Sequence, residues 1–285
     1  MKTFKIIFTC FCLILFGSHA LIAQEKEEKE DKGKRPVRDP FGSSLIIDNQ
    51  TSIVPSKGTL QFDMNHRFGT LDNGFSDFFG IYAPGANIRM GLTYSLIDDL
   101  AIGVGLSKLN MYLDLHAKYA IFKQRRDWSI PVGLTYYANM AIDTRDAENF
   151  EEGVHRYSYY HELIISSRLS RKISVQVTPS FSHYNAVDSL MSNDVIGIGV
   201  SGRFKVSSQT SIIFDYNKQL TSHEKFDVQP NYGLGVELTT SSHAFQIFAS
   251  TFQGILPQHN MVWNTNELKA EGLLLGFNIT RISAY

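Results

Sequence analysis

Apolar and polar residues alternate along most of the chain after Gly58. In the first such stretch Leu60, Phe62 and Met64 take one parity, while Gln61 and Asp63 take the other. A period of two residues places successive side chains on opposite faces of an extended strand. The same period recurs down the chain and predicts twelve strands, each with one apolar and one polar face.

The last stretch, Gly272–Tyr285, shows why these strands should form a closed sheet. Leu273, Leu275, Phe277 and Ile279 share one parity, and the chain ends on an aromatic residue. A strand at the end of a chain leaves its backbone donors and acceptors unpaired on one edge, which invites aggregation. Pairing the last strand with the first removes that edge, so the pattern predicts an antiparallel β-barrel.

The predicted connections alternate in length. Those after the even-numbered strands are short, around residues 98, 124–127, 170, 207–208 and 241–242. Those after most odd-numbered strands are long, at residues 69–86, 143–153, 185–194, 218–230 and 254–268. Only the link after the third strand breaks this rule. An even strand count with alternating short and long connections is typical of outer-membrane barrels, with short periplasmic turns and long extracellular loops.

A soluble β-sandwich is the competing fold, since its strands also alternate. Lysine is scarce on the apolar parity, and a sandwich gives no reason for the alternating connection lengths. We therefore favour the transmembrane barrel, although Pro131 and Pro179 weaken the fifth and seventh strands because proline cannot donate to a ladder.

Four segments are expected. Residues 1–23 resemble a secretory signal, with Lys2 and Lys5 before a short apolar run. Residues 24–40 are almost wholly charged and predict a disordered tether, or simply a solvated tail. Residues 41–57 are too apolar for a linker and too short for a domain, so they should fold into the barrel lumen or under its periplasmic mouth. Residues 58–285 should form the barrel.

Composition excludes several functions. The 285-residue chain has a net charge of −1, which does not favour nucleic acid as a partner. Both cysteines, Cys10 and Cys12, lie in the predicted signal, so the exported chain should carry neither a disulfide nor a reactive thiol. We expect no cofactor and no catalytic residues. Expected partners are outer-membrane lipid, the barrel assembly machinery and an unknown small-molecule solute.

The polar parity defines a set of residues that should line the lumen. They are Asp63, Arg67, Arg89, Asp114, His116, Lys118, Arg156, Glu162, Arg168, Arg203, Asp215 and Glu237. Cations and anions are nearly balanced in this set. Mutual pairing is the simpler explanation, because unpaired buried charge is costly. A polar path that selects a solute is the alternative.

Other candidate chemistry is weaker. Asp114 and His116 share a face as metal ligands do, but spacing supplies no third ligand. The acidic stretch 143–152 lacks EF-hand spacing, so a solvated loop is favoured over weak calcium binding. A phospholipase-like barrel would need a serine and a histidine base close together. His161 and Ser167 share the lipid-facing parity, yet they lie roughly 20 Å apart along an extended strand.

Several short motifs stand out along the chain: Arg35–Phe41 (RPVRDPF), His66–Gly69 (HRFG), Phe79-Gly80, Ala86–Arg89 (ANIR), Asn193–Val195 (NDV) and Gly276–Ile279 (GFNI). In these motifs the chain resembles a family of uncharacterised outer-membrane β-barrels of Bacteroidetes-type bacteria. The resemblance covers about residues 35–285 and implies an outer-membrane location with no known activity. Together with the pattern it predicts a channel, a transporter or a structural component of the envelope. A lipid-modifying enzyme is the alternative.

Overall fold

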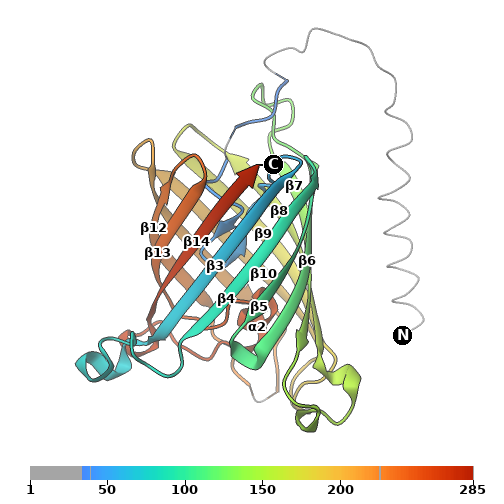
Figure 1. Ribbon diagram of the computed structural model, residues 1–285, viewed down its shortest axis with the longest axis vertical. Coiled ribbons are helices and arrows are strands. Elements are labelled where there is room, and N and C mark those ends of the chain that lie inside the picture. Colours follow the sequence, from blue (N-terminus) through green and yellow to red (C-terminus); the bar gives the residue numbers. More distant parts are fainter. Residues whose placement is uncertain (1–33, 39, 225, 285) are drawn as a thin grey trace. The chain divides into compact units, whose positions relative to one another are not determined.

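The computed structural model describes residues 34–38, 40–224 and 226–284. The predicted signal segment and most of the predicted tether lie outside these residues. The compact unit that begins at Pro36 is a closed barrel of twelve antiparallel strands (Figure 1). This confirms the predicted fold class.

The wall runs through β3 to β14 in chain order. Its strands are β3 (Thr59–Thr70), β4 (Asn87–Ile97), β5 (Leu100–Ser107), β6 (Tyr112–Phe122), β7 (Gly133–Asp143), β8 (Tyr157–Arg168), β9 (Ile173–Tyr184), β10 (Asp194–Lys205), β11 (Thr210–Gln219), β12 (Asn231–Thr239), β13 (His243–Ser250) and β14 (Leu274–Ala284). β14 pairs with β3, with Ile279 opposite Met64, and so closes the sheet. One bulge between Leu274 and Gly276 shifts the register there.

The two faces of the wall are inverted relative to a water-soluble protein. Large apolar side chains such as Leu106 (62% exposed) and Ile247 (68% exposed) point outward, whereas Gln61, Asp63 and Asn65 are buried inside. An apolar belt around a closed barrel is stable only in lipid, which cannot satisfy an open strand edge. This inversion excludes the sandwich. None of the described helices is long and apolar enough to cross a membrane.

The fifth predicted strand begins later than the sequence pattern indicated. β7 starts at Gly133, and residues 123–132 form a longer connection that contains Trp128 and Pro131. Trp128 has φ 61°, which is incompatible with a strand. By contrast Pro179 lies within β9, opposite Ile198 of β10. The ladder between β9 and β8 has a gap at this position, as expected for a proline, which supplies no N–H to the ladder.

The connections give the barrel two different ends. Residues 98–99, 169–172, 206–209 and 240–242 form turns at one end, here called the short-turn end. The connection at residues 123–132 lies at this end as well. The long-loop end carries the other loops and the described short helices: η2 (Leu71–Asp77), η3 (Leu109–Met111), η4 (Ala147–Asn149), η5 (Gly153–Arg156), α2 (Pro257–Trp263) and η6 (Ala270–Gly272). The link after the third strand, residues 108–111, is the short exception.

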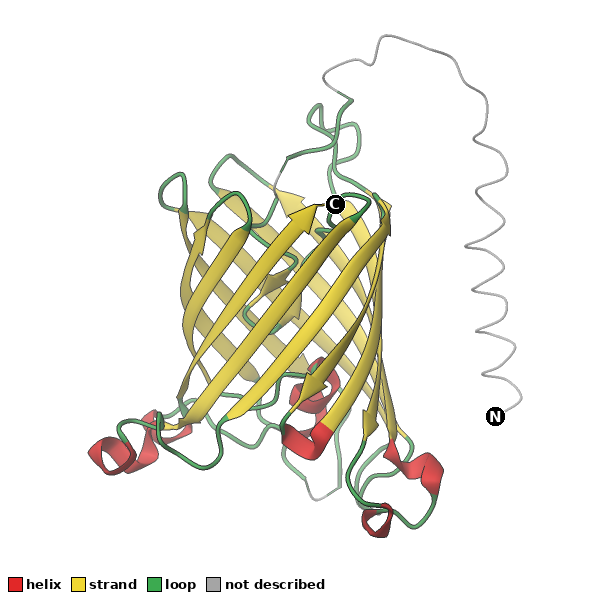
Figure 2. Ribbon diagram, viewed as in Figure 1, coloured by secondary structure: helices red, strands yellow, loops and turns green. Residues whose placement is uncertain are grey.

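Two segments fill the barrel rather than extend it. Residues 41–57, here called the plug, contain the small hairpin of β1 (Leu45–Ile46) and β2 (Asn49–Gln50). Figure 2 shows this hairpin inside the ring of strands. From the long-loop end, α2 turns inward and contacts β8, β9, β10 and β11. The plug and α2 therefore meet within the lumen.

Candidate functional site

The tip of the plug is held by three hydrogen bonds to the barrel wall. The Ile47 N–H donates to Gln246 Oε1 (3.0 Å), and the Ile47 carbonyl accepts from Asn278 Nδ2 (2.6 Å) and Arg67 Nη2 (3.2 Å). Ile47 is fully buried and has φ 53°, a conformation that β-branched residues rarely adopt. Such backbone strain costs about 1–3 kcal/mol and persists only where surrounding contacts enforce it. The wall therefore imposes this conformation on the plug.

Arg67 is the central contact between the wall and the plug. Its fully buried guanidinium pairs with Asp48 (3.2 Å) and lies over the ring of Phe248, 4.5 Å from the ring centre. Asp48 also accepts a hydrogen bond from Asn260 of α2. Burial raises the pKa of Asp48 to about 6, against the lowering effect of Arg67. One carboxylate thus joins the plug, the wall and the inward helix.

The flanks of the plug are held by polar groups from strands all round the barrel. Lys118 Nζ donates to the Ser44 carbonyl (2.9 Å), and Gln176 Nε2 donates to the Gln50 carbonyl (2.7 Å). The Ser166 hydroxyl donates to the Ser52 hydroxyl (2.7 Å). These contacts come from β6, β9 and β8, so no ladder joins the plug to a single strand. Each of these wall groups could instead bind water.

A smaller apolar contact fixes one side of the plug. Its members are Phe41, Ile46, Ile47, Ile213, Phe248 and Phe252, with Ile53 packed against them. Four of the seven belong to the plug itself. The wall thus contributes only a small apolar patch at this contact, and many plug–wall contacts are hydrogen bonds.

The inward helix α2 is anchored in a similar way. Gln258 Nε2 donates to Asn139 Oδ1 (2.8 Å), and Asn231 Nδ2 donates to the Asn260 carbonyl (3.1 Å). Met261 and Val262 pack against Tyr184 and Val195 of the wall. Burial lowers the pKa of His259 to about 4, so this histidine is neutral at pH 7. The helix therefore closes the long-loop side without adding charge there.

A second buried ion pair belongs to the wall alone. Arg89 of β4 binds Asp114 of β6 through both carboxylate oxygens, at 2.7 and 2.8 Å. Asp114 also accepts from Asn139 Nδ2 of β7 (3.0 Å) and lies 3.2 Å from His116 Nδ1. This group cross-links strands β4, β6 and β7. It does not include the plug.

The lumen is wide at both ends and narrow between them. A vestibule of about 910 Å³ opens at the long-loop end, lined by residues that include Tyr112, Tyr184 and Trp263. A second one of about 500 Å³ lies at the short-turn end beside Phe41 and Arg203. Between the plug, α2 and the wall, a central polar cavity measures only about 40 Å³. That space holds a few water molecules and no larger solute.

The structure gives definite places to the twelve residues predicted to line the lumen. Ten lie on the inner face of the wall: Asp63, Arg67, Arg89, Asp114, His116, Lys118, Glu162, Arg203, Asp215 and Glu237. Arg156 lies instead in η5 at the long-loop mouth, where it covers the Phe150 ring. Arg168 ends β8 at the opposite rim and donates to the Arg38 carbonyl. Alternation cannot tell where a strand stops, so it could not separate these two arginines at the rims from the residues inside the lumen.

Parity found Arg67 and Lys118 but missed other residues that hold the plug and the helix. Asp48, Gln246, Asn260 and Asn278 are all buried and bonded at this junction. Two of them are uncharged wall residues on the predicted inner parity, but amides were not included among the candidates. The only signal for the plug itself was the apolar run Leu45–Ile47 in an otherwise polar segment.

The other candidate chemistry finds little geometric support. His161 bonds to the Tyr136 hydroxyl (2.6 Å), whereas Ser167 donates to the Pro131 carbonyl (3.0 Å). Asp143 is paired with Arg145 (2.7 Å). Within the described ranges, no group of three or more His, Cys, Asp and Glu side chains is placed to hold a metal ion.

These features define a membrane-spanning β-barrel whose lumen is occupied by its own chain. The chain belongs to the family of the membrane-bound beta barrel domain DUF5777, whose model matches residues 41–282. The protein is thus a membrane-bound β-barrel with the even strand count and antiparallel closure of bacterial outer-membrane barrels. The matched region includes the plug as well as the wall.

Other comparisons give only distant likenesses. No curated protein matches the chain. The solved NanC porin is 8% identical over 79% of this chain and 99% of its own (TM-score 0.49). An outer-membrane channel from Pseudomonas putida F1 is 15% identical over 81% and 97% (TM-score 0.49). LpxR from Salmonella typhimurium is 12% identical over 80% and 100% (TM-score 0.37).

Proposed function

We propose that this protein is a channel for a small polar solute and that the structure shows its closed state. The plug blocks the lumen and must move for solute to pass. In this proposal the long loops face the outside of the cell and the short turns face the periplasm. The solute, the barrel assembly machinery as a partner and an origin in Bacteroidetes-type bacteria stay predictions, and so does the absence of enzymatic activity.

One observation carries the proposal: the plug is held mainly by polar wall groups that water could replace. Side chains such as Lys118, Gln176 and Ser166 would line a hydrated channel if the plug moved away. Several wall atoms, among them Ser182 Oγ and Gln176 Oε1, are buried without a hydrogen-bond partner in the described residues. A permanent dry core would be destabilised by such atoms, whereas a wall that meets water is not.

The segment before the plug lies at the short-turn end, so the plug can leave the lumen toward that end. The Val37 N–H donates to the Gln124 carbonyl (2.8 Å), and Arg126 Nε donates to the Pro36 carbonyl (3.1 Å). These contacts fix the segment before the plug to the connection between β6 and β7. The segment that leads into the plug is therefore bound at the short-turn end, which is the periplasmic side in the proposed orientation. Movement of the plug toward that side breaks no strand ladder of the wall.

A disulfide between plug and wall tests the proposal. The chain from residue 24 onward has no cysteine, and the Ser52 and Ser166 hydroxyl oxygens lie 2.7 Å apart. A disulfide joins its sulfur atoms at about 2.0 Å, so Ser52→Cys with Ser166→Cys brings the two thiols close enough to form one. We expect the oxidised protein to stay closed in planar bilayers and the reduced protein to open intermittently.

Each single cysteine variant serves as a control, since neither should respond to reductant. A chain without residues 41–54 should conduct steadily, because nothing then fills the centre of the barrel. A deletion variant that folds but does not conduct would contradict the channel and favour a structural role. Release of fatty acid from phospholipid by the intact protein would instead support the enzyme.

A further inference from the structure

The loop between β3 and β4 holds large apolar side chains in the open. Within residues 74–82, here called the paddle, Phe75 is 82% exposed and Tyr82 is 77% exposed. Phe78, Phe79 and Ile81 are also exposed. Single exposed apolar residues are ordinary on a protein surface, but a contiguous cluster of this kind marks an interaction site. Exposure of these apolar side chains to water is unfavourable.

The paddle is a folded element. The Phe79 N–H donates to the Gly74 carbonyl (2.6 Å), and the Gly80 N–H donates to Asp77 Oδ1 (2.8 Å). The Phe75 and Phe79 rings lie 4.8 Å apart. Gly80 has φ 81°, and a Cβ there would come within 2.2 Å of the Gly69 carbonyl oxygen. The backbone is thus fixed in a form that presents the aromatic rings outward.

Phe78 and Phe79 strengthen this argument, because both have positive φ, 54° and 57°. Aromatic residues adopt this conformation at an energetic cost. The acidic Asp77 turns into the loop, where its second oxygen accepts from Asn73 Nδ2 (3.1 Å). The loop therefore satisfies this acidic side chain internally and leaves its apolar side chains outside.

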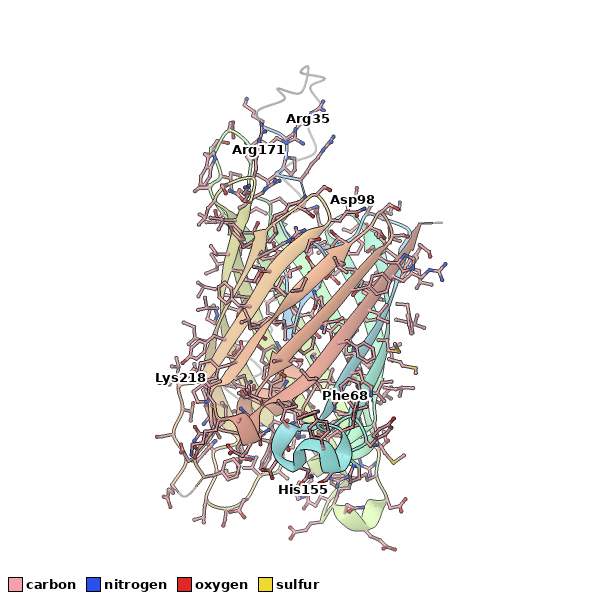
Figure 3. The ribbon with its side chains drawn as sticks, turned by 90° about the vertical axis from the view of Figure 1, so that its left-hand side faces the viewer. Arg35, Phe68, Asp98, His155, Arg171 and Lys218 are labelled. Atoms are coloured by element: carbon pink, nitrogen blue, oxygen red, sulfur yellow. The ribbon has the colours of Figure 1, made fainter. Side chains whose placement is uncertain are left out.

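The paddle stands beside the barrel wall, not over its mouth. Figure 1 shows η2 projecting sideways from the ends of β3 and β14, and Figure 3, turned by 90°, shows the same element in front of the wall near Phe68. The adjoining outer wall carries the stacked rings of His66 and Phe277, with Phe68 against them. These rings belong to the lipid-facing surface. The paddle adjoins this surface at the end of β3, where the Gly69 N–H donates to the Gly80 carbonyl (2.9 Å).

We propose that the paddle inserts into the acyl-chain region of the membrane leaflet at the long-loop end. Its occupant is lipid, because the paddle adjoins the lipid-facing belt and directs apolar rings away from the barrel. Aromatic and aliphatic side chains enter the boundary between headgroups and acyl chains in the same way on interfacial helices. The paddle thereby extends the membrane contact beyond the cylinder of strands and fixes the depth of the barrel on that side.

Fluorescence quenching tests this proposal directly. Phe75→Cys in the full mature chain would be labelled with an environment-sensitive dye and refolded into phosphatidylcholine vesicles that carry nitroxide on their acyl chains. Glu148→Cys, in the exposed loop 144–156, is the matched control. We expect quenching by the nitroxide lipid to be at least about threefold stronger at position 75 than at position 148, and quenching by aqueous iodide to be weaker.

A heat-dependent shift in gel migration would first establish that each labelled barrel is folded. Tyr82→Cys provides a second site on the paddle if Phe75→Cys does not fold. Access of iodide to position 75 without quenching by the nitroxide lipid would overturn the proposal, because the paddle would then lie in water. Protection from both quenchers would overturn it too, since a protein surface or a second copy of the chain would then cover the paddle.

Discussion

Arg67→Ala should open the barrel without unfolding it. The substitution removes the ion pair to Asp48, the hydrogen bonds to Ile47 and Asn278, and the contact with the Phe248 ring. Breaking a buried ion pair by removing one partner costs about 3–5 kcal/mol. Because these contacts hold the plug, we expect the open fraction in planar bilayers to rise by about a hundredfold or more, until it saturates. The thermal midpoint of the wall should change little.

The same variant should acquire a characteristic dependence on pH. Burial already raises the pKa of Asp48 to about 6 while Arg67 opposes that effect. Without Arg67 the pKa rises further, so the docked plug binds a proton that a released plug gives up. Docking is then favoured at low pH and weakens as the pH rises through the new pKa. Open probability should therefore increase with pH in Arg67→Ala and should not in Arg67→Ala with Asp48→Asn.

Arg89→Ala is the control for Arg67→Ala. It tests whether the loss of any buried cation opens the barrel or only the loss of Arg67. Its carboxylate partner, Asp114, belongs to the wall. We expect this variant to lower the thermal midpoint while the barrel stays closed. If Arg67→Ala remained closed at every pH, the plug would not depend on the pair between Arg67 and Asp48.

The strand pattern was predictable because alternation is a local property of the chain. Gln61, Asp63 and Arg67 face the lumen of this barrel because each lies two residues, or a multiple of two, from the others. The limits appear where local pattern and backbone geometry disagree. Trp128 and Ile130 continue an apolar alternation, yet the left-handed Trp128 and the following Pro131 delay the strand to Gly133. Alternation carries no information about such a turn.

The sequence suggested that residues 41–57 could enter the lumen, but their contacts could not be predicted, since these contacts cross the barrel. Asp48 and Arg67 are 19 residues apart in sequence and in different elements, and Asn260 joins them from 212 residues beyond Asp48. Parity gives the face of a side chain but not its depth along the axis or its partner across the lumen. For the same reason parity groups Asp63 with Arg67 on the inner face without giving their partners, and Asp63 accepts hydrogen bonds from Thr280 and Gln61. Only closure of the sheet decides such pairs.

Asp114→Asn should destabilise the wall more than any other single change of charge that leaves the plug in place. Asp114 is fully buried and binds Arg89, Asn139 and His116 across three strands. The amide keeps the shape of the carboxylate but leaves the Arg89 guanidinium buried without a counter-charge. We expect a loss of about 3–5 kcal/mol in unfolding free energy. Thermal and urea unfolding of the refolded barrel would measure it.

Asp99→Asn is the matched control, because Asp99 pairs with Lys123 at the same distance of 2.7 Å as Asp114 with Arg89. Both Lys123 and Asp99 are well exposed, so this pair should contribute no more than about 1 kcal/mol. The two substitutions are chemically identical and differ in burial, which isolates the desolvated charge as the cause. Equal effects would show that Arg89 finds water or another partner within the wall. Unequal effects, with the barrel closed in both variants, would establish that the buried pair of Asp114 and Arg89 stabilises the wall without holding the plug.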